Sequence, residues 1–366
     1  MGQVLREVAK KKLYQLLFTV YENLRNQKEP VLKIPKRSLS NVSFVPGKGL
    51  TLGTAFMERR LMSVKEARKF MQTLLVASVI LRAIEEGDYP TIRDIYYTVK
   101  HTITYRDAYG KVRHENTFDE QKESDDVIQD LEVMLGILRE GMGVMFDAKG
   151  RAAGKVIIKS KGSTIDLSKM GVGAWAIPPN VDEIDIVDVD AEYVLIIEKG
   201  AVFERLNNEE FWKKHRCVLV TGKGQPDRGT RRFVRRLHDE FGLPVYVLAD
   251  ADPYGAYIYL VYKIGSISLA YESERLAVLD AKWLGVWPSD ITRFRIPRRY
   301  IIKATPADIK RAKEILRYEW VQKDKHLRRE LELFLKRKDK VEIEAFSGFG
   351  FKYLSDEYIP RKLTLI

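Results

Sequence analysis

The chain has 366 residues, 45% of them hydrophobic, which is enough for about two or three folded domains. No run approaches the roughly 20 apolar residues that span a bilayer, and the N-terminus lacks a small-residue cleavage site, so we expect a cytoplasmic protein with no membrane partner. The single cysteine, Cys217, excludes an internal disulfide and a cysteine cluster for zinc.

Basic residues outnumber acidic ones. The sequence has 63 Lys and Arg against 51 Asp and Glu, a formal net charge of +12. This balance favours a polyanionic partner, with nucleic acid as the leading candidate. Many basic proteins of thermophiles and ribosomes do not read DNA, so charge alone leaves that alternative open.

The N-terminal segment, residues 1–64, is expected to be a helix followed by a linker. Residues 1–28 place apolar side chains near helical spacing, and Glu29-Pro30 ends the pattern. Residues 30–54 are rich in Pro, Gly, Ser and Lys, which is typical of a linker or an extended crossing segment.

Residues 65–160 read as a winged-helix DNA-binding domain. Apolar residues recur on one helical face from Phe70 to Ile84, and Gly87 ends that helix. Further helices are expected at 91–100 and 124–140. Residues 144–146 and 154–158, joined by the turn 147–150, read as a β-hairpin. Three helices and a hairpin suggest a winged helix-turn-helix, whose second helix usually reads the groove.

From residue 185 to 366 the pattern changes to that of an α/β domain. Short apolar strands are expected at 193–197, 218–220 and 245–248, with a weaker one at 264–269. Strands that are buried on both faces and alternate with helices imply a parallel sheet. Helices at 306–320 and 325–336 occupy the C-terminal third. The fold class is therefore multi-domain α/β.

Three carboxylates follow strands of this sheet. Glu198 ends Tyr-Val-Leu-Ile-Ile-Glu, and Asp250 and Asp252 follow Val-Tyr-Val-Leu-Ala. The carboxyl edge of a parallel sheet is where open α/β folds bind ligands. Hard oxygen ligands without His or Cys select Mg²⁺, with Mn²⁺ as an alternative. Such acids are also common helix N-caps, and each acid taken singly fits that structural role better.

A second constellation is Thr91-Ile92-Arg93-Asp94-Ile95-Tyr96-Tyr97. Arg93 and Tyr97 are i and i+4 neighbours on the expected helix, so the guanidinium can lie beside the phenol and the phosphate that the phenol attacks. Tyrosines in helices more often serve packing, and the chain has 18 of them. Tyr96 lies about 100° round the helix, so only one of the pair should face outward.

A third segment, Thr221 to Asp227, follows a strand and precedes an arginine-rich helix. Its glycines permit close approach of the backbone to a phosphate. We expect DNA to be contacted by Lys223, Arg231 and Arg232, and also by Lys149 in the turn 147–150. The alternative is a tight turn followed by a solvated basic face. The segment lacks the Walker spacing, so no ATP site is expected in this chain.

The ordered motifs together resemble one family. Arg-Asp-Ile-Tyr-Tyr, QKESDDVIQDLEVMLGILR, IIEKGAVFERL, GKGQPDRGTRRF and LADADPYG resemble the A subunit of archaeal topoisomerase VI, a type IIB DNA topoisomerase related to the meiotic double-strand-break proteins. The resemblance covers about residues 65–360. It implies that the α/β domain is a Rossmann-like Toprim domain.

The resemblance implies roles as well. The second tyrosine of the pair, Tyr97, would be the nucleophile, and Glu198, Asp250 and Asp252 would hold the metal. Two such subunits would form a homodimer in which the metal site of one serves the tyrosine of the other, leaving 5′-phosphotyrosyl ends on double-stranded DNA. A separate GHKL-type ATPase, the B subunit, would use ATP, contact residues 1–64 and complete an A₂B₂ heterotetramer. Such an enzyme would be nucleoid-associated.

Two other functions are compatible with these motifs. One is a meiotic-type protein that cleaves DNA without resealing it, which shares every motif. The other is a winged-helix DNA-binding regulator whose α/β domain senses a small ligand. The second predicts that Tyr97→Phe leaves function intact.

Overall fold

The computed structural model describes residues 2–366, which form two compact units. The first unit contains the residues up to Asn41 together with Leu52–Asp147, and the second contains Val42–Thr51 together with Ala148–Ile366. The chain therefore enters the second unit briefly, returns to the first, and crosses again after Asp147. No helix within residues 2–366 combines the length and apolarity needed to cross a membrane.

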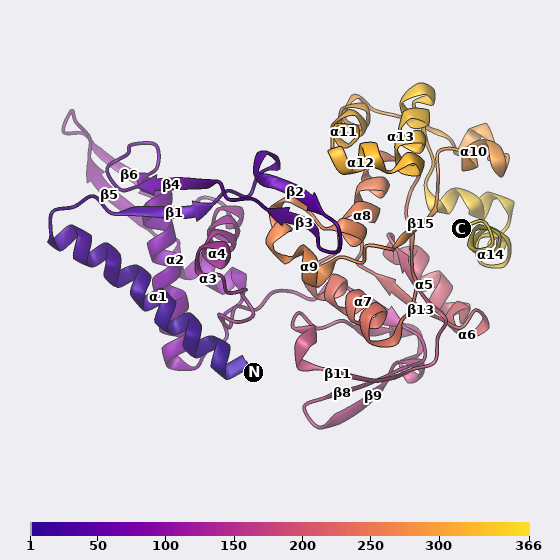
Figure 1. The fold of residues 1–366 in the computed structure, drawn as a ribbon, viewed down its shortest axis with the longest axis horizontal. Coiled ribbons are helices and arrows are strands. Elements are labelled where there is room, and N and C mark those ends of the chain that lie inside the picture. The colour runs from indigo at the N-terminus through magenta and orange to yellow at the C-terminus, as the bar shows by residue number, and fades with distance from the viewer. Residues whose placement is uncertain (1) are drawn as a thin grey trace. The chain divides into compact units, whose positions relative to one another are not determined.

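Helices build the core of the first unit (Figure 1). Helix α2 (Ala67–Glu86) ends at Gly87, as predicted, and Gly87 adopts the left-handed conformation with φ of 81°. Ile80, Ile95 and Leu131 are completely buried, one from each of three helices. The helices are α1 (Gly2–Arg25), α2 (Ala67–Glu86), α3 (Ile92–Val99) and α4 (Gln121–Leu135).

The region expected to be a linker contains strands. β1 (Val31–Pro35) pairs antiparallel with β4 (Phe56–Arg60), and the intervening β2 (Val42–Val45) and β3 (Gly49–Leu52) pair with each other. The buried side chain of Asn41 holds this crossing together, because its amide bonds to backbone groups of Lys36 and Ala55.

A buried charge cluster braces the first unit. Asp130 of α4 is 5% exposed and accepts hydrogen bonds from two arginines. Arg37 Nη2 lies 2.7 Å from Asp130 Oδ1, and the Arg59 guanidinium pairs with Oδ2. Arg59 also donates to Thr73 of α2 at 2.9 Å. The cluster therefore ties β4 and the segment before β2 to the helices.

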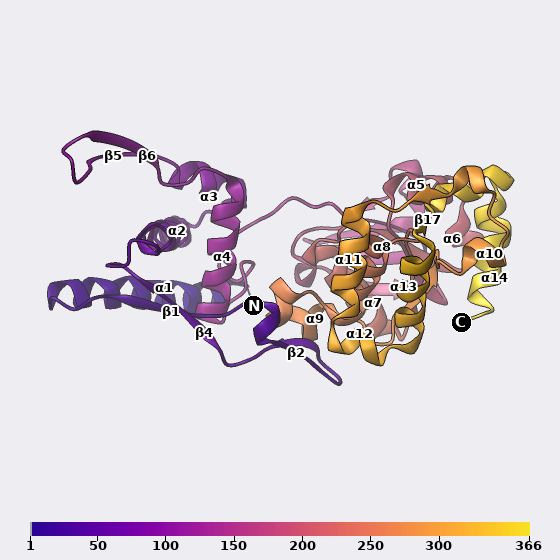
Figure 2. The ribbon, with the colours of Figure 1, turned by 90° about the horizontal axis from the view of Figure 1, so that it is seen from above.

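The predicted hairpin at 144–158 is wrong. Met145 makes only an isolated bridge to Thr91, and residues 146–150 form no strand. β7 (Arg151–Ala153) and β8 (Val156–Ser160) join different sheets, because Gly154 turns the chain between them. The hairpin of the first unit is instead β5 (Thr102–Arg106) with β6 (Val112–Asn116), which follows α3 and extends away from the helices of that unit in both ribbon views (Figures 1 and 2).

The main sheet of the second unit has the order β10-β7-β13-β12-β14-β15. Its strands from β13 to β15 run parallel, as predicted, while β7 and β10 add antiparallel partners at one side. The expected strand at 264–269 is wrong, since those residues end a helix and form a 3₁₀ turn. The strands are β7, β10 (Trp175–Ala176), β12 (Tyr193–Ile197), β13 (Cys217–Thr221), β14 (Val245–Leu248) and β15 (Lys282–Gly285).

Helices cover this sheet. Phe203 and Leu206 of α5 pack with Leu195 and Leu219 in one buried cluster, and α7 contacts the same two strands. A smaller sheet of β11 (Asp185–Val189), β8 and β9 (Ser163–Asp166) lies in the same unit. The helices next to the main sheet are α5 (Gly200–Asn208), α6 (Phe211–Lys214), α7 (Arg228–Phe241), α8 (Pro253–Ile264) and α9 (Ser273–Leu276).

The C-terminal third begins after β15. α11, α12 and α13 lie together in Figures 1 and 2, and the predicted helix 306–320 is interrupted after Leu316. Its elements are α10 (Asp290–Arg293), the 3₁₀ turn η6 (Arg298–Tyr300), β16 (Ile302–Lys303), α11 (Pro306–Leu316), α12 (Glu319–Lys323), α13 (Lys325–Arg337), β17 (Asp339–Lys340), the 3₁₀ segment η7 (Ile343–Phe349), the π-helical turn η8 (Leu354–Tyr358) and α14 (Ile359–Leu363).

Candidate active site

Tyr97 lies on α3, a short helix that its own sequence caps. The Thr91 hydroxyl accepts the Asp94 N–H, and the Asp94 carboxylate accepts the Thr91 N–H at 2.9 Å. Tyr97 is 62% exposed, whereas Tyr96 is 7% exposed. The prediction that only one of the two tyrosines faces outward is therefore confirmed.

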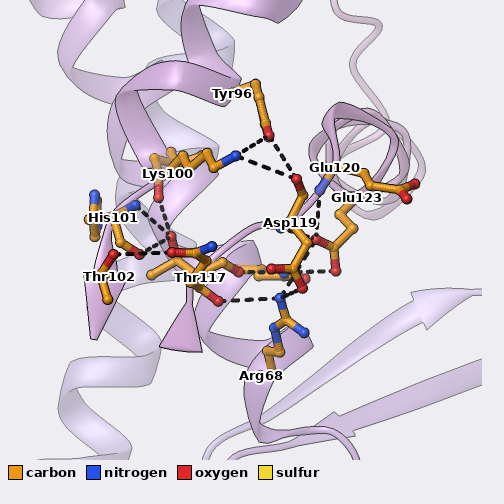
Figure 3. Close-up of polar contacts among 12 residues, drawn as sticks. Arg68, Tyr96, Lys100, His101, Thr102, Thr117, Asp119, Glu120 and Glu123 are labelled. Carbon is orange, nitrogen blue, oxygen red and sulfur yellow. Dashed lines mark hydrogen bonds and ion pairs between the residues drawn. The ribbon is translucent and has the colours of Figure 1, made fainter. Parts of the chain in front are cut away.

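A polar network fixes the inward-facing tyrosine (Figure 3). Tyr96 Oη donates to the Asp119 carbonyl at 2.9 Å and accepts from Lys100 Nζ at 2.8 Å. The two tyrosine rings lie 5.2 Å apart between centroids. The hydrogen bond with Tyr96, together with nearby negative groups, raises the pKa of Lys100. Lys100 is thus a cation beside the tyrosine pair, and its i+3 spacing from Tyr97 was the signal that could have identified it.

Arg93 occupies the exposed side of α3, one turn before Tyr97. It forms neither a hydrogen bond nor an ion pair with any side chain of the first unit that the structure describes. Its guanidinium is therefore available to an anion from outside the chain.

The structure brings Glu198 and Asp250 together at the carboxyl ends of adjacent parallel strands. Glu198 follows β12 and Asp250 follows β14, and Glu198 Oε2 accepts the Asp250 N–H at 2.8 Å. Asp250 is 7% exposed, and its Oδ1 accepts the Ile343 N–H at 2.8 Å. The strand ends therefore meet as the sequence suggested.

Two further acids, which the sequence did not identify, surround a lysine at this edge. Lys199 Nζ lies 3.1 Å from Asp250, 2.8 Å from Glu344 and 3.3 Å from Glu342. The edge thus holds Glu342 and Glu344 in addition to the predicted acids. No strand pattern precedes these two acids, so the rule that located the others could not find them.

Asp252 has the capping role that is the structural alternative to metal binding. Its Oδ1 accepts the N–H groups of Tyr254 and Gly255 at 2.9 and 2.8 Å and so caps α8. The cap uses one carboxylate oxygen. The other makes no hydrogen bond within residues 2–366, which leaves it available to a cation.

Burial, and to a lesser extent like charge, raises the pKa values of the acids at this edge. Burial and the charge of Asp250 raise the pKa of Glu198 to about 7, and burial raises that of Asp250 to about 6 despite its bonds to Ile343 and Lys199. Burial also raises the pKa of Asp252. Hard oxygen donors with crowded negative charge fit Mg²⁺. Within residues 2–366 no three acidic, His or Cys side chains are gathered as a ready ligand set, but Mg²⁺ commonly uses one or two carboxylates and keeps several waters.

The residues predicted to contact DNA fall into two groups. Lys223 and Lys149 are exposed. Arg232 is partly buried and its Nε donates to Asp182 at 2.8 Å, while Arg231 is only 1% exposed. The prediction that Arg231 contacts DNA does not fit this structure, because α7 turns that side chain into the core.

Comparisons with known proteins match almost the whole chain. Residues 68–144 match the family "Type IIB DNA topoisomerase", and residues 149–190 match "All-beta domain in DNA topoisomerase VI alpha subunit". Residues 193–363 match the family of the Toprim domain that the topoisomerase 6 A subunit shares with Spo11. The first and third matches contain the tyrosine pair and the three carboxylates, respectively.

Several relatives are similar over most of their length. The chain is 53% identical to the A subunit of type 2 DNA topoisomerase 6 from Aeropyrum pernix, over 98% of this chain and 93% of the relative. It is 39% identical to the Pyrococcus horikoshii protein of the same name, over 96% and 93%. The A subunit of DNA topoisomerase 6 from Arabidopsis thaliana is 38% identical, over 90% and 74%. The chain therefore belongs to the family of topoisomerase VI A subunits, which are type IIB DNA topoisomerases.

Proposed function

We propose that this chain is the DNA-cleaving subunit of its enzyme and that Tyr97 is the nucleophile. In the cleavage step the Tyr97 Oη–phosphorus bond forms and the phosphorus–O3′ bond breaks. The phenol gives up its proton, and the departing DNA oxygen takes one to become a 3′ hydroxyl. The exposure of Tyr97, on a capped helix beside a tyrosine that is fully engaged in packing, carries this proposal.

Arg93 and Lys100 would assist this step. Positive charge near the phenol favours its ionised form, and a guanidinium that binds a phosphate oxygen offsets the charge that develops there. Glu198, Asp250 and Asp252 would hold Mg²⁺, which when bound supplies Lewis-acid stabilisation of the phosphate and the departing oxygen. Reversal of the same step would reseal the strand, because the phosphotyrosyl bond conserves the free energy of the broken one.

The DNA-binding part would be a winged-helix domain in the first unit. The β5–β6 hairpin supports this, since it follows α3 directly and all ten of its strand residues are exposed. A two-stranded hairpin with so little burial is only marginally stable, so a partner surface such as duplex DNA suits it as a wing.

The complete enzyme would contain two copies of this chain and two copies of a GHKL-type ATPase subunit. In the dimer, the carboxylates of one copy would serve Tyr97 of the other. An aromatic stripe on α1 supports the contact with the ATPase subunit. Tyr14, Phe18 and Tyr21 are each about half exposed or more, and successive rings lie 6.1 and 6.3 Å apart.

The covalent link provides the direct test. The enzyme assembled with its ATPase subunit, Mg²⁺ and ATP is stopped with detergent, and protein-linked DNA is measured. Tyr97→Phe should form no adduct, while the matched variant Tyr96→Phe, which keeps the nucleophile, should still form it. Adduct formed by Tyr97→Phe would refute the nucleophile assignment.

The same assay separates the alternatives. Relaxation of supercoiled plasmid is expected, whereas linear DNA without relaxation would favour the meiotic-type function, which the shared Toprim family also includes. A ligand-sensing regulator has no support from the family to which the chain belongs.

A further inference from the structure

The second unit has two arginine-rich segments that use their charges differently. On α7, the segment first expected to contact DNA, each of three arginines has a carboxylate partner. Arg232 pairs with Asp182, and Arg235 and Arg236 pair with acids four residues further along the helix, Asp239 and Glu240. These charges are already neutralised within the chain, so α7 has little to offer a phosphate.

The other segment runs from the last residue of α10 to the turn before β16. Arg293, Arg295, Arg298 and Arg299, here called the arginine run, fall within seven residues, and the sequence has no acid between Asp290 and Lys303. All four side chains are exposed. None forms an ion pair with a residue of the described chain. Arg293 and Arg299 instead lie over aromatic rings, at 5.6 and 4.9 Å from the centroids of Trp287 and Tyr300.

Apolar residues that alternate with the arginines anchor the run. Ile296 is 5% exposed, and Phe294 and Tyr300 are partly buried against the core cluster of the second unit. The Phe294 ring lies 4.8 Å from that of Tyr358. The backbone is therefore held in place while the guanidiniums face outward. Arg293 and Arg295 also line a hollow of about 490 Å³.

The arginine run is joined to the carboxylate edge through η7. Ile343, the first residue of η7, bonds to Asp250. Near its other end, Gly348 lies so close to the Tyr300 ring that a side chain there would collide with it. Phe346, between them, packs on Phe294. Seven residues of 3₁₀ helix span roughly 12 Å, which is the length of about three or four base pairs of duplex.

We propose that the arginine run is a second DNA contact, which holds backbone phosphates of the duplex a few base pairs from the phosphate that is cleaved. The inference rests on the proposed function, because it takes duplex DNA as the substrate. Exposed guanidiniums without acidic neighbours suit a polyanion, and they contact phosphates without reading sequence. The run would therefore add affinity and orient the duplex over the carboxylate edge.

The test measures how DNA affinity depends on salt. Tyr97→Phe chains assembled with the ATPase subunit are titrated into a labelled 40-base-pair duplex at several salt concentrations. Each phosphate contact contributes about 0.9 to the slope of log K against log salt. Because two copies of the chain act on one duplex, the double variant Arg298→Gln/Arg299→Gln removes four guanidiniums, and it should lower the slope by about 3.6 and weaken binding more than tenfold at low salt. Arg293→Gln/Arg295→Gln should act similarly.

Lys213→Gln/Arg216→Gln is the matched control. It also removes two positive charges, but from exposed side chains that are already paired. Lys213 pairs with Glu210, and Arg216 pairs with Asp190 and Glu192. The control should leave the slope unchanged. An equal fall in both variants would mean that only net charge matters and would overturn the proposal. An unchanged slope in the arginine variants would overturn the proposal too. This holds even if sedimentation shows that the substitutions separate the two copies of the chain.

Failure of the arginine run and failure of the proposed function give different results. Wild-type enzyme that binds DNA and forms no covalent adduct would contradict the role of Tyr97, while a lower slope in the double variant would still support the run. Normal adduct formation with an unchanged slope would refute the run alone.

Discussion

The two units present their chemical groups in opposite ways. In the first, Tyr97 is exposed on a short helix, and Arg93 and Lys100 stand near it on the same helix or at its end. In the second, Asp250 is buried at the edge of a parallel sheet and fixed by a backbone N–H and a lysine. A nucleophile must reach a large substrate, whereas metal ligands must be held in place. The difference in burial agrees with the roles proposed for these residues.

The two units also differ in where they store charge. The first unit buries Asp130 between two arginines, where it stabilises the scaffold. The second unit gathers Glu198 and Asp250 at one edge of its sheet, where burial raises the pKa values of both acids. Crowded carboxylates destabilise a fold unless a cation joins them, which is typical of functional sites.

The largest expected effect is at the carboxylate edge. Asp250→Asn with Asp252→Asn should remove two of the three proposed metal ligands and slow cleavage by about 10³-fold, since Lewis-acid stabilisation is worth several kcal/mol and each 1.4 kcal/mol is a factor of about ten. DNA affinity, measured in parallel, should persist. Undiminished cleavage would show that these acids are structural caps and nothing more.

Loss of the buried charge cluster should come next, and it should act on stability. Asp130→Asn leaves Arg37 and Arg59 without a charged partner, which costs about 3–5 kcal/mol. The thermal transition of the first unit should shift down. Asp190→Asn is the control, because its pairs with Lys155 and Arg216 are exposed and screened by solvent, so that their loss should hardly change stability. Equal shifts in both variants would contradict the assignment of Asp130 as a brace.

A smaller effect is expected for Arg93. Arg93→Gln should lower the rate of adduct formation about 10- to 100-fold, as for removal of one charge-stabilising group, while the Tm changes little because the side chain is exposed. Lys65→Gln, a charge change at an exposed position outside α3, should leave the rate near that of the wild type. A rate that falls equally in both would mean that Arg93 contributes only to overall charge.

The smallest effect is on the helix that carries Tyr97. Thr91→Ala removes the α3 cap and should cost about 1 kcal/mol, measured by hydrogen exchange of α3 amides. The hydrogen bonds from Thr91 lower the pKa of Asp94 below its ordinary value of 3.8. Their stabilisation is therefore present above pH 3.8 and is lost as the pH falls through the lowered pKa. A difference between wild type and Thr91→Ala that does not shrink in this acidic range would contradict the capping role.

Local pattern was sufficient for most elements. Helical spacing located α2, α3 and α4, and continuous apolar runs located β12, β13 and β14. The errors came from tertiary context. Ile264 is apolar because it ends the buried α8, and a short apolar run does not distinguish a strand from a buried helix end.

The candidate site was predicted in part for similar reasons. Glu198 and Asp250 follow strands, so topology places them together without further information. Glu342 and Glu344 reach the same edge from a distant segment, which requires the tertiary fold. The pairing of α7 arginines with acids also depends on contacts that the sequence does not show. The exposed Tyr97 has no burial signature, so its identification depended on the motif.

The most direct test asks whether Tyr97 of one chain and the carboxylates of another chain form one shared site. Differently tagged Tyr97→Phe and Asp250→Asn/Asp252→Asn chains are purified as a mixed dimer with the ATPase subunit, each having been shown to be inactive by itself. We predict one intact site per mixed dimer, and therefore nicked DNA attached only to the chain that retains Tyr97. No cleavage by the mixed dimer, or DNA attached to the Tyr97→Phe chain, would contradict the shared site.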